Sequence, residues 1–308
     1  MATPLIDADH LDEPGIQRLI EYILAGGVHG LFLLGTTGEG PHLSHQLRHD
    51  FVARACRQVA GRVPVLVGIT DTIYGESLRM AERACAEGAA TVVLAPPYYV
   101  PLGQPELCDY VEQVAADSPL PVFLYNMPNC TKVSYAPETV ARLLHLPNLA
   151  GLKDSSGDMA YFSRIVRIAA HRPEFSLLIG PEDLLLDALS LGAHGGVNGG
   201  ANLAPHWLAA FYAAAIAGDT ELQDRYRAAV AALGQVYGLG GKTDWGYLKG
   251  LKTALQLLGL CRGGVARPFQ PFGAEERQAI RQILDGLADL APQAPRVASE
   301  WDSVVNDS

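Results

Sequence analysis

One lysine in this sequence occupies a position at which a buried amine could bond covalently to a substrate. Lys153 follows the apolar run 149–152, and the polar, glycine-containing turn 154–158 comes directly after it. At the end of a buried strand a lysine faces a pocket, where lost hydration favours the neutral amine. A neutral amine attacks a ketone and forms a Schiff base. The alternative is a lysine at the rim of the protein, paired with Asp154.

A pair of hydroxyl groups follows another apolar run. Thr36 and Thr37 lie in the glycine-rich segment 35–40, which begins with Gly35. Flanking glycines let backbone N–H groups approach a ligand, and such a nest suits a carboxylate. The alternative is a plain tight turn before the helix that begins near Ser44.

Tyrosines follow two further runs. Tyr98 and Tyr99 come after run 91–94, and Tyr125 comes after run 121–124. A tyrosine at the end of a strand can carry protons to and from a bound substrate. The alternative for each is an amphipathic tyrosine at the rim, with a buried ring and a hydrated hydroxyl.

Acidic and glycine-rich segments follow the last two runs. Glu182 and Asp183 form an acidic pair, and the segment 195–202 contains Asn198 and Gly199. The acidic pair either caps the next helix or binds substrate hydroxyls. The glycines either hold an anion or let the backbone pass close to a ligand.

The His, Asp and Glu residues show no spacing typical of a metal site, so we predict a metal-independent mechanism without a bound cofactor. The lysine, the tyrosines, the threonine pair and the glycine-rich segment follow the ends of different apolar runs. Together they favour the Schiff-base chemistry of Lys153 over the rim alternative.

The elements that position these residues alternate along the chain. Helices are predicted from apolar spacing of three to four residues, at 13–25, 44–60, 75–87, 105–116, 137–144, 158–170, 181–191 and 205–217. Continuous apolar runs between them are typical of parallel strands covered on both faces; they lie at 28–34, 64–67, 91–94, 121–124, 149–152, 175–179 and 195–197.

This alternation predicts a (β/α)8 barrel over residues 1–218, with residues 2–6 as the eighth strand. That strand begins almost at residue 1, so it is either short or trimmed at the start of this sequence. A doubly wound open sheet is the alternative, but no GxGxxG motif follows the first strands. Because barrel active sites lie at the C-terminal strand ends, all the candidate residues fall at one end.

A helical extension is predicted over residues 219–308, with helices at 220–237, 244–258 and 274–290. We expect it to pack on the barrel and to help oligomerisation. The tail 291–308 shows little periodicity and is expected to fray.

Composition excludes several classes of function. Of the 308 residues 49% are hydrophobic and 18% charged, which fits a large folded core. The formal net charge of −10 argues against nucleic acid or an anionic membrane as the main partner. Five scattered cysteines, with no signal peptide and no run of about 18 apolar residues, predict a cytoplasmic protein.

The chain resembles the dihydrodipicolinate synthase/N-acetylneuraminate lyase family of pyruvate-dependent class I aldolases. Four motifs carry the resemblance, in the family's order: GTTGE at 35–39, PYY at 97–99, YNMP at 125–128 and GLKD at 151–154. The resemblance covers essentially the whole chain. It implies a (β/α)8 barrel, a homotetramer, and the substrates pyruvate and an aldehyde.

The resemblance also implies roles for individual residues. Lys153 would form the imine with the C2 carbonyl of pyruvate or another 2-oxo acid, and Tyr125 would be the general acid and base. Thr36 and Thr37 would bind the carboxylate of the 2-oxo acid. Tyr99 would correspond to the tyrosine that completes a proton relay with Thr36 and Tyr125.

Departures from the family pattern bear on the substrate. The synthase branch typically has an arginine two residues after the proline of the YNxP motif, whereas here Cys130 stands there and the nearest cation is Lys132. The lyase branch places adjacent acidic residues where Glu182 and Asp183 stand, in the opposite order. We therefore predict a lyase that cleaves a 2-oxo-3-deoxy sugar acid, or a related hydroxylated 2-oxo acid, to pyruvate and an aldehyde.

In this interpretation Cys130 and Asn198 line the distal pocket. Three alternatives remain: dihydrodipicolinate synthase itself, a 2-oxo-acid dehydratase that uses the same imine, and a non-catalytic sensor. The intact set of Lys153, Tyr125 and Thr36 argues against the sensor, because a binding module needs no nucleophilic amine.

Overall fold

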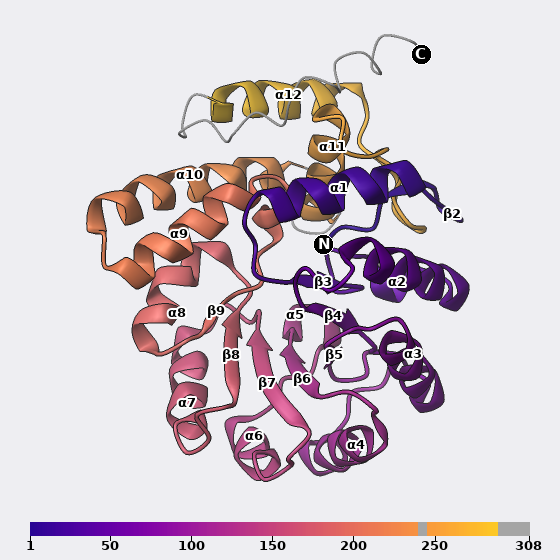
Figure 1. The fold of residues 1–308 in the computed structure, drawn as a ribbon, viewed down its shortest axis with the longest axis vertical. Helices are drawn as coiled ribbons and strands as arrows, with labels where there is room; N and C mark the ends of the chain where they lie inside the picture. Colours follow the sequence, from indigo (N-terminus) through magenta and orange to yellow (C-terminus); the bar gives the residue numbers. More distant parts are fainter. Residues whose placement is uncertain (240–244, 289–308) are drawn as a thin grey trace. The chain divides into compact units, whose positions relative to one another are not determined.

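A computed structural model describes residues 1–239 and 245–288 (Figure 1). The chain divides into two compact units. The first contains Met1–Thr3 and His29–Gly199, and the second contains Pro4–Val28 and Gly200–Ser308. This division differs from the predicted boundary between residues 218 and 219, which falls between two helices of the second unit and stays a prediction.

The first unit is built on a parallel sheet of seven strands, which lie in the order of the chain. The continuous apolar runs form these strands, as predicted. They are β3 (Leu31–Leu33), β4 (Val65–Gly68), β5 (Thr91–Leu94), β6 (Val122–Asn126), β7 (Leu149–Asp154), β8 (Ser176–Ile179) and β9 (Gly195–Gly196). The strand order never reverses, so the sheet lacks the switch point of a doubly wound fold.

Longer helices follow the strands and lie outside the curled sheet (Figure 1). They are α2 (His45–Val59), α3 (Tyr74–Ala86), α4 (Gln104–Asp117), α6 (Pro137–Leu143), α7 (Met159–Ala169) and α8 (Leu185–Leu191). The loops also contain the short helix α5 (Pro128–Thr131) and the 3-10 turns η1 (Gly40–His42) and η2 (Glu182–Leu184). The short α5 was not predicted. The repeated unit of a parallel strand followed by a helix is that of the (β/α)8 barrel fold. Further helices follow in the C-terminal part of the chain.

Capping side chains start two of these helices. The Ser44 hydroxyl accepts a hydrogen bond from the Leu47 amide at 3.2 Å and begins α2. The Asp158 carboxylate accepts from the Ala160 and Tyr161 amides at 2.9 and 3.0 Å and begins α7. Such caps satisfy amides that lack a partner within the helix.

The predicted strand at residues 2–6 is wrong as a single element. Met1–Thr3 lie beside β3, where the Met1 nitrogen donates to the Phe32 carbonyl at 2.6 Å. Residues 5–7 instead form β1 (Leu5–Asp7), which pairs antiparallel with β2 (His10–Leu11). Pro4 stands between the two segments and has no N–H with which to continue a ladder.

The second unit is mainly helical. Its first part contains the β1–β2 hairpin and α1 (Glu13–Ala25). Its second part begins within the 3-10 turn η3 (Gly199–Asn202) and continues with α9 (Pro205–Ala217), α10 (Thr220–Gly238), α11 (Gly246–Leu257) and α12 (Ala274–Ala288). Asp12 joins distant parts of this unit, because its carboxylate accepts from the Gly15 amide at 3.1 Å and the Arg262 amide at 2.7 Å. The three predicted C-terminal helices are confirmed, apart from residues 244, 289 and 290, and the tail 291–308, which lie outside the described residues.

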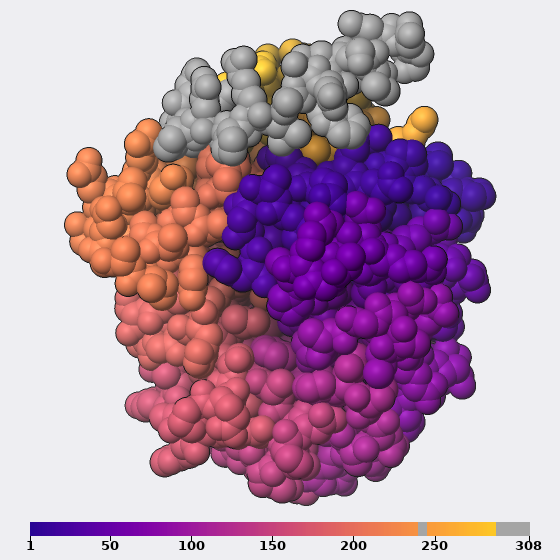
Figure 2. Space-filling model, in the orientation of Figure 1, coloured from indigo at the N-terminus to yellow at the C-terminus, as the bar shows by residue number. Residues whose placement is uncertain are grey.

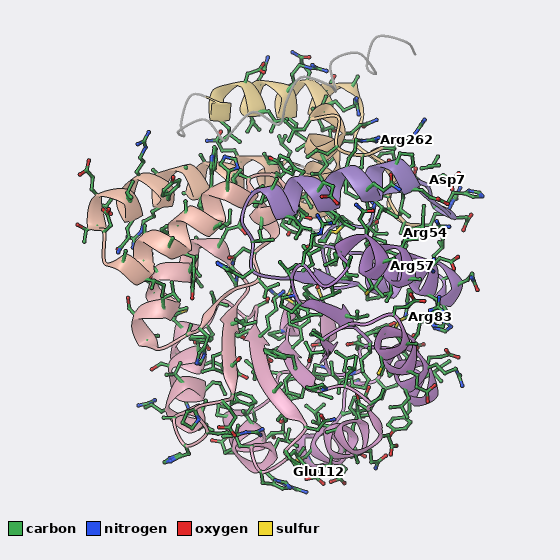
Figure 3. All side chains as sticks on the ribbon, in the orientation of Figure 1. Asp7, Arg54, Arg57, Arg83, Glu112 and Arg262 are labelled. Atoms are coloured by element: carbon green, nitrogen blue, oxygen red, sulfur yellow. The ribbon has the colours of Figure 1, made fainter. Side chains whose placement is uncertain are left out.

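Side chains close the spaces between the ribbons of the first unit (Figure 2). On its outer helices the charged side chains of Arg57, Arg83 and Glu112 lie away from the sheet (Figure 3). Arg57 and Arg83 both pair with Glu87, at 3.5 and 2.8 Å. Among the described helices, none is long and apolar enough to cross a membrane.

Candidate active site

The register of two neighbouring strands places Lys153 beside Tyr125. The two residues are paired across β6 and β7, so their side chains leave the sheet on the same face. The Lys153 amine lies 4.3 Å from the centre of the Tyr125 ring. The lysine is only 8% exposed and the tyrosine 7%. The amine and the phenol, which sequence analysis places at the ends of two different strands, therefore lie together at one end of the sheet.

A second aromatic ring completes the wall around the amine. The Lys153 Nζ lies 5.0 Å from the centre of the Phe32 ring. Phe32 and Tyr125 meet edge to face, with ring centres 5.9 Å apart. Both rings pack with Val93 and Ala95 in one buried apolar cluster. This wall keeps water away from the amine, while the ring faces attract it whenever it is charged.

The rim alternative for Lys153 does not hold. Within the described residues Lys153 forms no ion pair with Asp154. Asp154 is fully buried and accepts hydrogen bonds from the Asn126 amide group at 2.8 Å and from the Ser156 hydroxyl at 2.9 Å. Because successive side chains alternate along a strand, Asp154 and Lys153 leave β7 on opposite faces.

Thr36 contacts the phenol directly. Its Oγ1 lies 3.2 Å from the Tyr125 hydroxyl, and either oxygen can donate. The loop that carries Thr36 is tightly folded: a Cβ on Gly35 would lie 2.6 Å from the Phe32 ring, and one on Gly40 only 2.2 Å from the Leu34 carbonyl. These two glycines are needed for close approach, and Thr37 follows Thr36 in the same half-buried turn.

Cys130 extends this chain of contacts. It lies on α5, and its thiol is hydrogen-bonded to the Thr36 side chain. Burial raises the pKa of the Cys130 thiol, which the charge of Lys132 and the bond to Thr36 only partly offset. The thiol is therefore neutral near pH 7. Lys132 itself is exposed, and its amine donates to the Asn129 carbonyl at 2.7 Å.

Two polar residues hold this end of the sheet together: Asn126, to which sequence reasoning gave no role, and Asp154, which it considered only as a partner of Lys153. The Asn126 amide group donates to Asp154, and its carbonyl accepts from the Tyr135 amide at 3.1 Å. Burial raises the pKa of Asp154, and the hydrogen bonds from Asn126 and Ser156, which lower that pKa, only partly offset the effect. Asn126 directly follows Tyr125, and Asp154 directly follows Lys153. A polar residue next to each candidate at a strand end was therefore the sequence signal that could have indicated this contact.

The remaining predicted residues are less closely tied to the amine. Tyr99 is 85% exposed. The Asn198 amide group donates to the Gly180 carbonyl at 2.8 Å, which joins the loops after β8 and β9. Glu182 and Gly199 are half-buried and Asp183 is exposed, at the same end of the sheet. The roles predicted for these residues stay predictions.

Within the described residues, no three His, Cys, Asp or Glu side chains are grouped so that they could hold a metal ion. The site contains a buried lysine at the carboxyl ends of the barrel strands, beside a phenol that contacts a threonine. This arrangement is typical of a carbon–carbon lyase that forms a Schiff base. The chain belongs to the dihydrodipicolinate synthetase family, whose model matches residues 1–287.

Solved structures and curated proteins agree with this assignment. The chain is similar to the dihydrodipicolinate synthase of Bacteroides thetaiotaomicron, with 47% identity, a TM-score of 0.89, and 93% of this chain and 96% of that chain covered. It is also similar to a prophage protein of the same family from Escherichia coli K12, solved in complex with pyruvate, with 30% identity, a TM-score of 0.88, and coverage of 93% and 96%.

A third relative points to a different substrate. A probable 2-dehydro-3-deoxy-D-pentonate aldolase of Escherichia coli K12 is 32% identical over 252 residues, which cover 81% of this chain and 82% of that protein. The relatives of this chain thus include proteins named as synthases and one named as a probable sugar-acid aldolase.

Proposed function

We propose that this protein is a Schiff-base aldolase that cleaves a 2-oxo-3-deoxy sugar acid, or a related hydroxylated 2-oxo acid, to pyruvate and an aldehyde. The observation that carries the proposal is the buried Lys153 amine, 4.3 Å from the ring of a tyrosine whose hydroxyl is bonded to Thr36. No cofactor is needed, because the imine on Lys153 itself accepts the electrons.

The reaction begins at the 2-oxo group. The Lys153 nitrogen bonds to C2 to give a carbinolamine, whose hydroxyl leaves as water with the proton of Tyr125; a protonated imine and a Tyr125 phenolate remain. The carboxylate is held by Thr36 and Thr37 through backbone N–H and hydroxyl groups. The Tyr125 oxygen then removes the proton of the C4 hydroxyl, the C3–C4 bond breaks, and its electron pair moves toward the imine to form an enamine.

The second half returns the enzyme to its starting state. The aldehyde leaves, Tyr125 returns the proton to C3, and water adds to C2 of the imine. The C2–N bond breaks and pyruvate departs. In the condensation direction the same steps run backwards. The proton path through Tyr125 and Thr36 is short, because the two hydroxyl oxygens lie 3.2 Å apart.

The surroundings of Cys130 support an uncharged aldehyde over the aspartate semialdehyde of the synthases. The neutral Cys130 thiol is bonded to Thr36, and the nearby Lys132 amine is occupied by a backbone carbonyl. A carboxylate on the aldehyde would thus lack the bidentate guanidinium that an arginine at position 130 would supply, and Lys132 offers only a point charge that already donates to a backbone carbonyl. Glu182, Asp183 and Asn198 are proposed to contact the hydroxyl groups of the sugar acid, and Gly199 to let the backbone approach it.

We also propose that the chain acts as a homotetramer in the cytoplasm. Three large side chains on the loops after β4 and β5 are exposed: Ile73 by 55%, Tyr99 by 85% and Val100 by 62%. A second copy that covered them would remove apolar surface from water. Tyr99, as a relay residue, would then act across this contact. All five cysteines are free thiols, as expected for a reducing compartment.

Borohydride reduction tests the imine. Wild-type protein is incubated with pyruvate and sodium borohydride, and the mass of the intact chain is measured. We expect one reduced pyruvate adduct, located on the peptide that contains Lys153, and none in Lys153→Ala. An unmodified wild-type chain, or an adduct that persists in Lys153→Ala, would contradict the proposal and leave the sensor alternative.

Product analysis then separates the enzymatic alternatives. Condensation with pyruvate is measured for glyceraldehyde, N-acetylmannosamine and aspartate semialdehyde, and cleavage is measured for 2-dehydro-3-deoxy-D-pentonate. Pyruvate plus an aldehyde as products excludes a pure dehydratase. A preference for aspartate semialdehyde over both neutral aldehydes would identify a synthase instead.

A further inference from the structure

A buried arginine outside the reacting groups joins three loops at the carboxyl end of the sheet. Arg48 lies in the first turn of α2 and is only 8% exposed. Its guanidinium group donates to acceptors on two different loops, and it acts on the Tyr98 side chain of a third loop. A charged side chain at this depth is costly unless all its bonds are made.

The first acceptor lies on the loop between β3 and α2. The Arg48 Nε donates to the Leu43 carbonyl at 3.0 Å. This is the loop that carries Thr36 and Thr37, so the bond holds its C-terminal end. At its other end the loop is held by the close packing of Gly35 on Phe32.

The second acceptor lies on the loop between β4 and α3. An Arg48 terminal nitrogen donates to the Asp71 carboxylate at 2.8 Å, and the other carboxylate oxygen accepts from the Ile73 amide at 3.1 Å. Burial would raise the pKa of Asp71, but hydrogen bonds from His45, Ile73 and Arg48 and the charge of Arg48 together hold it below its ordinary value. Asp71 is therefore a carboxylate in the folded protein.

The third contact is with the loop after β5. Burial raises the pKa of the Tyr98 phenol, and the charge and side chain of Arg48 act against that shift, so the two groups lie within reach of each other. The same loop is tied to its neighbour a second time, because the Ala95 amide donates to the Thr70 hydroxyl at 2.8 Å. Tyr99 follows Tyr98 directly, so its backbone position depends on this anchor.

Only an arginine can make this set of contacts. The planar guanidinium group carries five N–H donors in fixed directions, whereas a lysine carries three donors on one rotating atom. A lysine at position 48 would keep a charge for Asp71 and lose at least one of the other two loops.

We propose that Arg48 is a positioning residue for the reaction at Lys153: it holds the loops that carry Thr36 and Tyr98–Tyr99 in the places where they serve the proton path. The inference rests on the proposed function and adds a residue that touches neither the substrate nor the reacting atoms. Misplacement of such groups by about 1 Å lowers rates by roughly 10²-fold.

The test uses a reaction that needs no aldehyde. Pyruvate bound as the enamine exchanges its C3 protons with D₂O, and proton NMR follows the exchange. We expect Arg48→Gln to lower the maximal exchange rate by roughly 10- to 100-fold. The pyruvate concentration at half-saturation should change by less than about threefold. Arg48→Lys should recover part of the rate, because it retains the charge opposite Asp71.

Arg172→Gln is the matched control. Arg172 also bonds to a neighbouring loop through partly buried bonds, at the opposite end of the same sheet, and its variant should lose thermal stability without loss of exchange rate. If Arg48→Gln does not fold, Tyr98→Phe removes a single polar contact of the same anchor and should lower the rate by about threefold to tenfold. Full exchange in a folded Arg48→Gln protein, or equal losses of rate in Arg48→Gln and Arg172→Gln, would overturn the inference.

The borohydride adduct distinguishes the two proposals. An adduct in wild type and in Arg48→Gln, with slow exchange only in the variant, supports both. Failure of the wild-type protein to form the adduct overturns the proposed function and this inference with it. An adduct in both proteins with equal exchange rates overturns only the role of Arg48.

Discussion

At the carboxyl end of the sheet Arg48 contacts one carbonyl, one carboxylate and one phenol, whereas at the amino end Arg172 contacts mainly carbonyls. Two Arg172 bonds go to the Leu144 and Leu146 carbonyls, at 2.9 and 2.7 Å, and a third goes to Pro147 at 3.2 Å. Its remaining bond, to Glu174, is made at the surface, where that carboxylate is 69% exposed.

Asn148, which also lies at the amino end of the sheet, likewise bonds to backbone carbonyls. Its amide group lies within hydrogen-bond distance of the Ala115, Ser118 and Leu120 carbonyls, at 2.9, 3.3 and 3.2 Å. These carbonyls belong to helix ends and turns whose oxygens lack backbone partners. Arg172 and Asn148 at the amino end thus bond mainly to the backbone, whereas Arg48, Asn126 and Asp154 at the carboxyl end also bond to other side chains beside the reacting groups. Stability and chemistry are divided between the two ends.

Removal of the amine should have the largest effect. We expect Lys153→Ala to lose pyruvate exchange by roughly 10⁴-fold or more, because the amine that forms the imine is removed. Proton NMR in D₂O measures the loss, and circular dichroism checks that the variant folds. Exchange within about tenfold of wild type would place the covalent step elsewhere.

Tyr125→Phe should separate binding from proton transfer. The ring remains against Phe32, so the imine should still form and be trapped by borohydride. Exchange should fall by roughly 10²- to 10³-fold, because the proton carrier is gone. The measurement is the exchange rate against pyruvate concentration. A loss of pyruvate affinity as large as the loss of rate would contradict the role of Tyr125.

A cation at position 130 should change the preferred aldehyde. Cys130→Arg places a carboxylate partner next to Thr36, so the ratio of kcat/KM for aspartate semialdehyde to that for glyceraldehyde should rise by about tenfold. Cys130→Ser, which stays neutral, is the control and should leave the ratio unchanged. An equal rise in both variants would show that size, and not charge, selects the aldehyde.

Arg172→Gln should act on stability alone. Loss of its bonds leaves partly buried carbonyls unsatisfied, and a fully buried group would cost about 1–3 kcal/mol, so we expect a loss at or below the lower end of that range. Urea unfolding measures the loss, and pyruvate exchange should match wild type. A variant of normal stability, or one with slow exchange, would remove the distinction between the two ends of the sheet.

Asp154 should make a smaller, pH-dependent contribution. Its pKa is raised in the folded protein by burial, so its protonated form favours folding. The contribution is fully present below the ordinary pKa of an aspartic acid and is lost as pH rises through the folded-state pKa. The free energy of unfolding of Asp154→Asn, which cannot ionise, should therefore depend less on pH across that window. Identical pH profiles by urea unfolding would contradict the shift.

Much of the fold could be predicted because it depends on short-range pattern. Continuous apolar runs bounded by helical periodicity become parallel strands wherever both faces are covered. The alternation alone therefore places Lys153 and Tyr125 at strand ends. The strand at 2–6 failed for a local reason, because Pro4 divides it.

Contacts between loops were beyond the reach of sequence reasoning. Arg48 and Asp71 are 23 residues apart, and Thr36 and Tyr125 are 89 apart. No local pattern records which polar side chains meet when the sheet curls. The sequence by itself determined the strands, the helices and the amine at the end of one strand. Only the tertiary structure decided that Tyr99 is exposed, that Cys130 bonds to Thr36 and that one buried arginine joins three loops, because those outcomes depend on strand register and loop packing.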